Sequence, residues 1–477
     1  MSSHAFDFLI LGAGSTAFAA AIKASELGAK VAMIERRTLG GTCANRGCLP
    51  SKNLLEAARI VWQAAHPRFP GLQPAPMGID FAALINQKDD VVHAYRAQRY
   101  EQVAEGLEGL ELFTGDARFD DPTTISMDGT TVGADRLLIA TGSRPTVPPI
   151  PGLDSIPFLT SDLLDADEEG RLTALPESLV VLGGGYVAAE LAQLFARFGS
   201  RVTIVQRGER LLARYEPELG DLLGSIFRSE GIDLLTGATV EKVQGDAAEI
   251  AVDVEVLGER RTIRSQRLLV AAGRQANTDS LALDVAGVSM TDTGFVKVNA
   301  GLQTTQPHIW AAGDVIDGQW ASQLATPVGA RQGRLVAENA FAGAHHVVDH
   351  AVVPRAIFTD PPIGTVGLTE AEVRRRHLPA ITKVTPMEYV PRAAAIYRPE
   401  GLVKIIASSI DEHVLGVHVI GEAASEIVHE AAMGMRFKAT LADFVDLIHV
   451  YPTMAEALKI GALAFSRDVS KLSCCAE

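Results

Sequence analysis

The hydrophobic and polar positions of the N-terminal part predict strands that alternate with helices. A short apolar run covers residues 6–11, apolar residues at helical spacing follow over 18–27, and a second strand is expected at 31–34. The same order returns later, with strands at 179–182 and 202–205 around another helical pattern. Strands that alternate with helices are typical of parallel, doubly wound sheets. The pattern therefore predicts two α/β domains of this kind.

The segment between these two units has a mixed pattern. Helices are expected at 53–65 and, as one long and partly solvated helix, at 81–106. Turn signals between short alternating stretches predict a β-meander over 112–136. A buried strand at 137–142 ends in Thr-Gly, and the proline-rich residues 145–151 are typical of a linker. We therefore place these elements in the first domain.

After about residue 350 the pattern changes again. Strands of one antiparallel sheet are expected at 354–368, 403–407 and 414–420, with helices at 425–438 and 453–465. No glycine-rich turn that could hold a cofactor interrupts this region. The pattern predicts a separate α+β domain, which we expect to form an interface.

Composition and charge narrow the range of partners and locations. A chain of 477 residues is too long for one hydrophobic core. Its formal charge of −15 argues against a nucleic acid or an anionic membrane surface as partner. No apolar run reaches the roughly 18 residues that a membrane helix needs, and no basic leader precedes the first strand. We expect a cytoplasmic protein, in which cysteines typically serve catalysis or metal binding.

The first strand leads into a glycine turn, Gly12-Ala-Gly14-Ser-Thr-Ala17, and the second strand ends at Glu35. Glycines in this spacing let the backbone approach a pyrophosphate at a helix N-terminus. The acid about 20 residues further on would accept hydrogen bonds from a ribose. The motif alone matches many turns, but together with its strands and acid it predicts a dinucleotide site.

The second unit repeats this turn as Gly183-Gly-Gly185, but its second strand ends in Gln206-Arg207 instead of an acid. An acid there would bind the ribose of NAD, whereas arginine suits the 2′-phosphate of NADP. Arg207 could also be an ordinary surface charge. The missing acid nevertheless favours NADPH.

Three further strand ends carry candidate ligand residues. Thr141-Gly142 and Gly273 each end a buried strand, and Asp314 follows a strand at 309–312. In a doubly wound domain, an aspartate at the carboxyl end of a strand lies where a ligand hydroxyl would bind. Alternatively, Asp314 could cap the helix that starts after Thr326.

Residues 40–52 read GGTCANRGCLPSK and contain Cys43 and Cys48 in a Cys-x4-Cys spacing. An uneven helical turn, with Gly47 between them, can bring the two sulfurs within disulfide range. A thiolate near a helix N-terminus and Lys52 should have a lowered pKa. A buried structural pair or half of a zinc site are the alternatives, but no histidine cluster or nearby second cysteine pair accompanies them. The stretch therefore favours redox chemistry.

These features together resemble the flavoprotein pyridine nucleotide-disulfide oxidoreductases, such as glutathione reductase and dihydrolipoamide dehydrogenase, over essentially the full length. The resemblance implies two Rossmann-like doubly wound dinucleotide-binding domains plus a C-terminal α+β dimerisation domain. Residues 1–150 would be the first part of the FAD domain with the cysteine pair, 151–275 the NADPH domain, 276–345 the second part of the FAD domain, and 346–477 the interface domain. It also implies a homodimer with active sites shared between subunits.

The resemblance assigns roles residue by residue. Cys48 would be the flavin-proximal charge-transfer thiol and Cys43 the interchange thiol, with Tyr186 as an aromatic gate over the flavin and Glu190 paired with Lys52. The FAD-binding positions would be Gly12, Gly14, Ala17, Glu35, Gly41, Thr42, Lys52, Thr141, Gly142 and Asp314. The NADPH-binding positions would be Gly183, Gly185, Glu190, Gln206, Arg207 and Gly273.

Two features near the C-terminus bear on the substrate. Members of the family that act on disulfides use the histidine of a His-Pro-Thr-x-x-Glu motif, but here the segment runs from Tyr451 to Glu456 as YPTMAE. A phenol with a pKa near 10 cannot replace an imidazole as a base near neutral pH, and His449 should point elsewhere. Cys474 and Cys475 could capture a soft metal ion. Alternatively, Tyr451 is a packing aromatic and the cysteine pair is incidental.

Tyr451 and the terminal cysteines resemble the branch of the family that reduces Hg(II) to Hg(0) with NADPH and FAD. In that branch Hg(II) would pass from Cys474 and Cys475 of one subunit to Cys43 and Cys48 of the other. Low-molecular-weight thiols or a mercury carrier protein would deliver the ion, because the chain begins at the FAD fold. The alternatives are a disulfide reductase and a flavoprotein that sequesters soft metals. Arg46, beside the thiols, could lower a thiolate pKa or lie on the surface.

Overall fold

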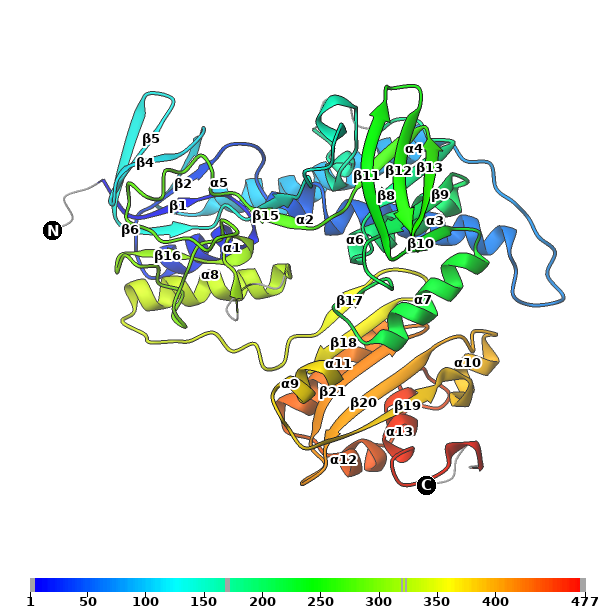
Figure 1. Cartoon of the computed structure of the whole chain (residues 1–477). Helices are drawn as coiled ribbons and strands as arrows, with labels where there is room; N and C mark the ends of the chain where they lie inside the picture. Colours follow the sequence, from blue (N-terminus) through cyan, green and yellow to red (C-terminus); the bar gives the residue numbers. More distant parts are fainter. Residues whose placement is uncertain (1–4, 168–171, 319–320, 322–323, 472–477) are drawn as a thin grey trace.

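The computed structural model describes residues 5–167, 172–318, 321 and 324–471, which form three regions (Figure 1). The N-terminal region contains a seven-stranded sheet with the strand order β3-β2-β1-β6-β5-β4 and β16 beside β6. Its strands are β1 (Phe6–Leu11), β2 (Val31–Glu35), β3 (Leu110–Thr114), β4 (Arg118–Asp121), β5 (Thr124–Met127), β6 (Thr130–Ile139) and β16 (Ile309–Ala311). The pairs β3-β2, β2-β1, β1-β6 and β6-β16 are parallel, as the alternating pattern predicts.

Two helices from distant parts of the chain, α1 (Ser15–Glu26) and α8 (Thr326–Phe341), lie together on one face of this sheet (Figure 1). They approach closely because Gly333 has no side chain: a Cβ there would lie 2.0 Å from the carbonyl oxygen of Thr16. The expected meander is only partly correct. β4, β5 and β6 pair antiparallel, but β3 extends the parallel sheet by pairing with β2.

A helical segment joins this region to the next. Its helices are α2 (Gly41–Asn45), α3 (Cys48–Ala65), α4 (Phe81–Arg96), a π-helical turn η1 (Ala97–Glu101) and α5 (Gln102–Gly106). The single long helix expected at 81–106 is therefore a continuous helical run with a π-helical turn inside it. The cysteine stretch contains a break between α2 and α3, so Cys43 and Cys48 lie on different helices.

The second region has a four-stranded parallel sheet in the order β10-β9-β8-β14 and an antiparallel three-stranded sheet. The elements are β8 (Ser178–Leu182), α6 (Tyr186–Phe198), β9 (Arg201–Gln206), α7 (Pro217–Ser229), β10 (Asp233–Thr236), β11 (Ala238–Gly245), β12 (Ile250–Val256), β13 (Glu259–Ser265) and β14 (Arg267–Val270). Short strands β7 (Ser143–Pro145) and β15 (Arg274–Ala276) pair where the chain enters and leaves this region.

The C-terminal region is an antiparallel five-stranded sheet in the order β17-β18-β21-β20-β19 with helices packed on it. Its elements are β17 (Arg355–Ile357), β18 (Ile363–Gly367), α9 (Glu370–Arg375), β19 (Ala380–Pro386), α10 (Pro391–Ala395), β20 (Leu402–Ser408), β21 (Val414–Ile420), α11 (Ala424–Arg436), α12 (Leu441–Asp446) and α13 (Glu456–Leu463). The stretch expected as one strand at 354–368 forms two strands, and β19 was not expected. The α+β architecture is otherwise as predicted.

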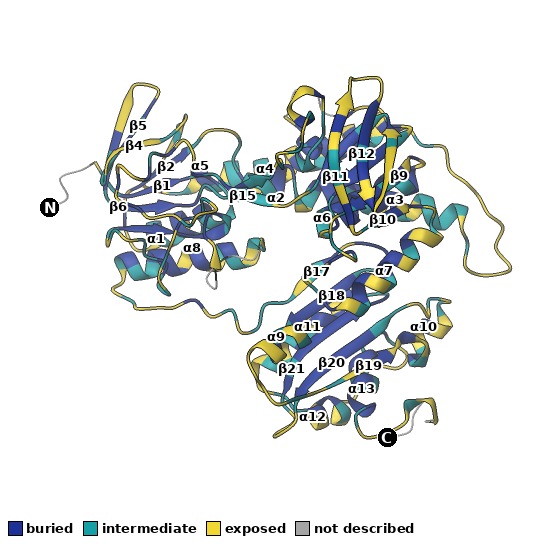
Figure 2. Cartoon of the chain, viewed as in Figure 1, coloured by how far each residue is buried: buried dark blue, intermediate teal, exposed yellow. Residues whose placement is uncertain are grey.

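Burial follows the apolar pattern of the strands. Phe8, Leu9, Ile10 and Leu11 of β1 are fully buried, and Figure 2 shows the central strands of each sheet as the most buried elements. Within the described parts of the chain, no helix combines the length and apolarity needed to cross a membrane.

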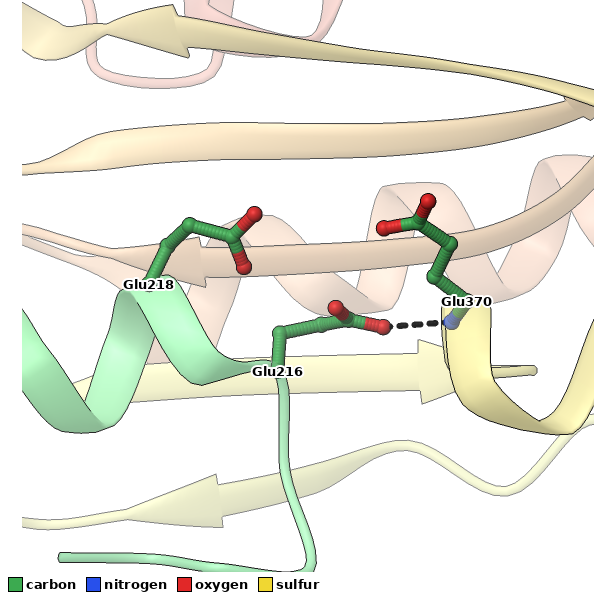
Figure 3. Close-up of side chains that lie close together, drawn as sticks. All are labelled: Glu216, Glu218 and Glu370. Carbon is green, nitrogen blue, oxygen red and sulfur yellow. Dashed lines mark hydrogen bonds between the residues drawn. The ribbon is translucent and has the colours of Figure 1, made fainter. Parts of the chain in front are cut away.

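An ion cluster joins the second region to the C-terminal region. Lys404 on β20 is 1% exposed, and its Nζ lies 2.6 Å from Glu216, 2.8 Å from Glu218 and 2.9 Å from Glu370. Figure 3 shows the three carboxylates converging from the start of α7 and from α9, with the backbone N–H of Glu370 donating to Glu216 at 2.6 Å. The lysine ammonium is the cation that these carboxylates surround. We call these four residues the Lys404 cluster.

Candidate active site

The first glycine turn follows β1 and begins α1. Gly12 has a φ of +102°, and a Cβ there would lie 2.5 Å from the carbonyl oxygen of Ala140, so only glycine fits. Gly14 caps α1 without a side chain, and the helix starts with its first backbone N–H groups pointing out of the turn. Gly41 packs against this turn, because a Cβ on Gly41 would lie 2.8 Å from the Cα of Gly14.

A cavity of about 350 Å³ opens over this turn. It brings together most of the residues expected to bind FAD, although they are far apart in the sequence. The expected residues on its wall are Gly12, Gly14, Glu35, Gly41, Thr42, Cys43, Thr141, Gly142 and Asp314. Ala17 is fully buried beneath the turn instead. Neither Lys52 nor Cys48 is on the wall of this cavity.

The carboxylate of Glu35 is held at the end of β2. It accepts hydrogen bonds from the backbone N–H groups of Ala13 and Arg37, both at 2.8 Å. Glu35 therefore connects the glycine turn to the neighbouring strand and carries a negative charge at one end of the cavity.

Asp314 lies at the end of β16, in the 3₁₀ turn Gly313–Val315, so it does not cap α8, which starts at Thr326.

Three residues of the cavity wall were missed by the sequence analysis. The side chain and backbone of Asn277 form two reciprocal hydrogen bonds with Thr141, both 2.8 Å long. Ser143 lies 3.5 Å from the carboxylate of Asp314, and Thr326 lies beside the cysteine pair. No local motif marks these positions, because they reach the cavity only through the pairing of β7 with β15 and the packing of α8 on α1.

The cysteine pair consists of two free thiols at the junction of α2 and α3. Cys43 is half-buried in α2, and Cys48 is the exposed first residue of α3. Gly47 between them allows the close approach of the two helices, because a Cβ there would lie 2.9 Å from the carbonyl oxygen of Thr42. The break between the helices thus brings the two thiols within hydrogen-bonding range of each other.

The two thiols have very different pKa values. A hydrogen bond from Cys43, the positive charge of Lys52 and a hydrogen bond from Thr326 lower the pKa of Cys48 to about 6, against the opposing effect of partial desolvation of its sulfur by nearby protein atoms. The same hydrogen bond to Cys48, together with burial, raises the pKa of Cys43. Near neutral pH, Cys48 is therefore a thiolate and Cys43 is its protonated partner.

Lys52 is held by an ion pair with the second region. Its Nζ lies 2.7 Å from Oε2 of the buried Glu190, and Oε1 of Glu190 accepts the backbone N–H of Phe358 at 2.8 Å. Lys52 also lies 4.7 Å from the ring centroid of Phe358. Three regions of the chain thus meet at Glu190.

Tyr186 lies one turn before Glu190 at the start of α6, and burial raises the pKa of its phenol.

The second glycine turn has the geometry of the first. Gly183 has a φ of +125°, and a Cβ there would lie 2.3 Å from the carbonyl oxygen of Ala271; Gly185 caps α6. The side chain of Gln206 covers Gly184, and its amide donates to the carbonyl oxygen of Arg210 at 3.3 Å. Arg207 is exposed beside it. Gly273, with a φ of +128°, ends the segment after β14.

The C-terminal candidates lie in another region from the cysteine pair (Figure 1). Tyr451 is 50% exposed between α12 and α13, and Glu456 starts α13 and accepts the backbone N–H of Thr453 at 3.1 Å. His449 lies 2.9 Å from Glu430 and 3.1 Å from the carbonyl oxygen of Leu447, so both of its ring nitrogens are engaged. Cys474 and Cys475 lie outside the described residues.

A family profile described as pyridine nucleotide-disulphide oxidoreductase matches residues 6–341, and the dimerisation domain of that family matches residues 353–462. The chain belongs to this family and is an oxidoreductase, and membership implies a flavin and a pyridine nucleotide as cofactors.

Among its relatives, the mercuric reductases of Staphylococcus aureus and Streptomyces lividans are 41% and 42% identical to it over 471 and 477 residues. These alignments cover 99% of this chain and 84% and 98% of the relatives. The HOCl-induced flavoprotein disulfide reductase RclA from Escherichia coli has a similar structure, with a TM-score of 0.83, 28% identity and coverage of 96% of this chain and 99% of that chain. The expected fold class and the resemblance to the Hg(II)-reducing branch are confirmed.

Proposed function

We propose that this chain is an NADPH- and FAD-dependent reductase of Hg(II) that works as a cytoplasmic homodimer. The observation that carries the choice of substrate lies at residues 449–451. Tyr451 stands where disulfide substrates need a histidine base, and both ring nitrogens of the nearby His449 are engaged. Hg(II) needs thiolates and electrons but no such base, and the full-length relatives named mercuric reductase agree with this substrate.

The first cavity fits FAD. Its glycines leave room for a pyrophosphate at the start of α1, and Glu35 offers a carboxylate to a ribose. Asp314, at the end of β16, would accept a hydrogen bond from a hydroxyl of the ribityl chain. When bound, FAD would supply the redox chemistry that links hydride from the nicotinamide to two electrons at the cysteine pair.

The second glycine turn fits a nicotinamide dinucleotide with a 2′-phosphate. Gln206 ends β9 without an acid, and the exposed Arg207 offers a positive charge next to it. Tyr186, at the start of α6, would be the side chain that moves aside when the nicotinamide binds over the flavin. A preference for NADPH over NADH in kcat/KM would support this assignment.

The cysteine pair is suited to take Hg(II) from a thiol complex. The Cys48 thiolate would attack the metal and displace one thiolate of the complex. Cys43 would then displace the second thiolate and give its proton to a departing thiolate. Lys52 favours the thiolate of Cys48, and Glu190 keeps Lys52 in place. After two electrons have been transferred to the metal, Hg(0) leaves and both sulfurs remain as thiolates.

Tyr451 and Glu456 would act at the site of the partner subunit, since the chain carries the dimerisation domain of the family. Cys474 and Cys475 would collect Hg(II) from low-molecular-weight thiols or a carrier protein and pass it to Cys43 and Cys48 of the other subunit. Changing both terminal cysteines to alanine should slow the reduction of Hg(II) bound to bulky thiols and leave the flavin content unchanged. Equal rates with such a complex would refute the role of the terminal pair.

Oxidation of NADPH with different acceptors tests the proposal. Hg(II) in excess small thiol, lipoamide, oxidised glutathione and Cu(II) would be compared, with mercury vapour trapped. Sustained oxidation with Hg(II) and recovery of volatile mercury are expected. Turnover of a disulfide, or inhibition after one equivalent of Hg(II), would show a disulfide reductase or a metal-sequestering flavoprotein instead.

A further inference from the structure

Arg46 does not lie on the surface, which was one of the two alternatives that the sequence left open. It follows α2, and its side chain is 8% exposed, with Nη1 lying 3.2 Å from the buried carboxylate of Asp165. The charges with the largest effects on the pKa of Cys48 are those of Lys52 and Glu190. Arg46 is therefore a buried cation directed toward the segment that follows the 3₁₀ turn Ser161–Leu164.

One donor of this guanidinium lacks a partner. The Nε of Arg46 is buried and forms no hydrogen bond with any described residue. A buried donor without a partner is costly, and the cost is larger for a charged group. Arg46 is also part of the wall of the cavity described above. The guanidinium thus has a hydrogen-bond donor that the described residues leave unused, and a turn of the side chain would present this donor to a ligand in the cavity.

The position of Arg46 indicates which part of a ligand it would meet. Gly40 pairs with Gly14 of the phosphate turn, and Gly41 packs against the same residue. Arg46 lies one helical turn after Thr42, whose carbonyl oxygen accepts its backbone N–H at 2.9 Å. The guanidinium is therefore carried by the helix that abuts the turn where a pyrophosphate would bind.

The charge of the surroundings fits an anionic group. Asp165 is shared by Arg46 and Arg37, at 3.2 and 3.5 Å, and Asp162 lies 3.6 Å from Arg37. Arg36 and Arg274 are also on the cavity wall. Among the residues that the structure describes, the wall thus carries five arginines, with Arg144 as the fifth, against three acids, Glu35, Asp162 and Asp314. Arginine forms strong, charge-assisted hydrogen bonds with phosphate oxygens.

We infer that Arg46 is a cofactor-binding residue whose guanidinium donates a hydrogen bond to the pyrophosphate of FAD. Asp165 holds the guanidinium from the opposite side and keeps it directed into the cavity. This inference rests on the proposed binding of FAD in this cavity.

The release of flavin from the purified holoenzyme tests the inference, measured as the rise of flavin fluorescence after dilution. Arg46→Met should release FAD about tenfold faster than the wild type, because a charge-assisted hydrogen bond is lost. Arg46→Lys keeps the charge without the Nε donor, so its rate of FAD release should lie between those of the wild type and Arg46→Met. Arg197→Met is the matched control: Arg197 is also a buried arginine paired with carboxylates but is not on the cavity wall, so its substitution should lower the melting temperature and leave the release of FAD nearly unchanged.

If Arg46→Met releases FAD at a rate within about twofold of the wild-type rate, the inference is overturned. A twofold change in rate corresponds to well under the free energy of one hydrogen bond. Equal release from Arg46→Met and Arg197→Met would also overturn it, since the loss of any buried ion pair would then explain the effect. If Arg46→Met is insoluble, Arg46→Gln and Arg46→Lys provide the same comparison. The flavin extracted from the wild type is identified first, so that absence of FAD refutes the proposed function separately.

Discussion

The thiol of Cys48 ionises near neutral pH because three neighbours favour its charged form. Two of them, Cys43 and Thr326, donate hydrogen bonds, and the third, Lys52, supplies a positive charge. Glu190 opposes them, since its negative charge raises the pKa of Cys48. The reactivity of one sulfur thus depends on residues from α2, α3, α6 and α8.

Lys52→Met should raise the pKa of Cys48 from about 6 toward the ordinary value for a cysteine, because the cation is lost while the negative charge of Glu190 remains. The rate of alkylation of the reduced enzyme by iodoacetamide, measured against pH, reports this shift. Lys23→Met, which removes a lysine paired with Glu26 on α1, is the control and should leave the profile unchanged. An unshifted profile in Lys52→Met would contradict the electrostatic role of Lys52.

Gly12 and Gly28 offer a matched pair of substitutions for the phosphate turn. Both have a positive φ, +102° and +83°, but a Cβ at Gly12 would lie 2.5 Å from a carbonyl oxygen whereas a Cβ at Gly28 meets nothing within 4 Å. Gly28→Ala should cost about 1–2 kcal/mol for its backbone conformation alone. Gly12→Ala should cost about 1–3 kcal/mol more from overpacking and should also lower the flavin content. Equal losses of unfolding free energy would show that the close contact with Ala140 relaxes freely.

At the scale of elements, the Lys404 cluster connects α7, α9 and β20. Lys404 is buried among carboxylates, and although burial opposes its protonation, hydrogen bonds with Glu216, Glu218 and Glu370 raise its pKa. Lys404→Met should lower the free energy of unfolding by about 3–5 kcal/mol, because it leaves the buried carboxylate of Glu216 and two partly exposed carboxylates without a cation. Urea denaturation measures this loss. Lys383→Met, on the exposed face of the neighbouring strand β19, is the control.

The same cluster makes the stability of the protein depend on pH. The pKa of Glu370 is lowered, first by its hydrogen bond with Lys404, so its contribution to stability is complete above its unfolded pKa and is lost as the pH falls through its folded pKa. In Lys404→Met this part of the acid destabilisation should disappear. Urea unfolding midpoints of the wild type and of Lys404→Met, measured at neutral and at acid pH, test this. Equal losses of stability on acidification in both proteins would refute the prediction.

At the scale of the whole molecule, an apolar face remains exposed on the C-terminal region. It runs along α11 and the loop after α12, and the contact between His449 and Glu430 joins the two. The residues of this face, exposed by 48% to 88%, are Met433, Phe437, Leu447, Ile448, Val450 and Tyr451. Such a patch is typical of a protein–protein interface, and it lies in or beside the segment that matches the dimerisation domain.

Ile448→Glu should convert the dimer into monomers, because it places a charge in the centre of this apolar face. Light scattering after gel filtration measures the mass. Leu257→Glu is the control: Leu257 is 93% exposed on the β12–β13 hairpin, far from this face, and its substitution should leave the dimer intact. A dimeric Ile448→Glu protein would show that another surface joins the subunits.

The sequence by itself determined the elements and the local turns of this protein. The period of the apolar residues predicts strands and helices, and the glycines at 12 and 183 mark turns that no other residue fits, because these signals depend only on neighbouring residues. The Cys-x4-Cys stretch likewise indicates redox chemistry from the residues themselves, whereas Tyr451 bears on the substrate only through the resemblance to the family. The boundaries within 81–106 and 354–368 were less well predicted, since a π-helical turn and a strand break leave little trace in the apolar pattern.

Only the tertiary structure decided which distant residues meet. Lys52 and Glu190 lie 2.7 Å apart across 138 positions, and Thr326 reaches the cysteine pair because α8 packs on α1. The burial of Arg46 and the Lys404 cluster also depend on contacts between regions. Hydrogen bonds and ion pairs act over a few ångströms in space, whereas a sequence orders residues only along the chain. A lowered pKa near Lys52 was predicted from the sequence, but the assignment of that lowered pKa to Cys48, and the effects of Thr326 and Glu190 on it, came only with the fold.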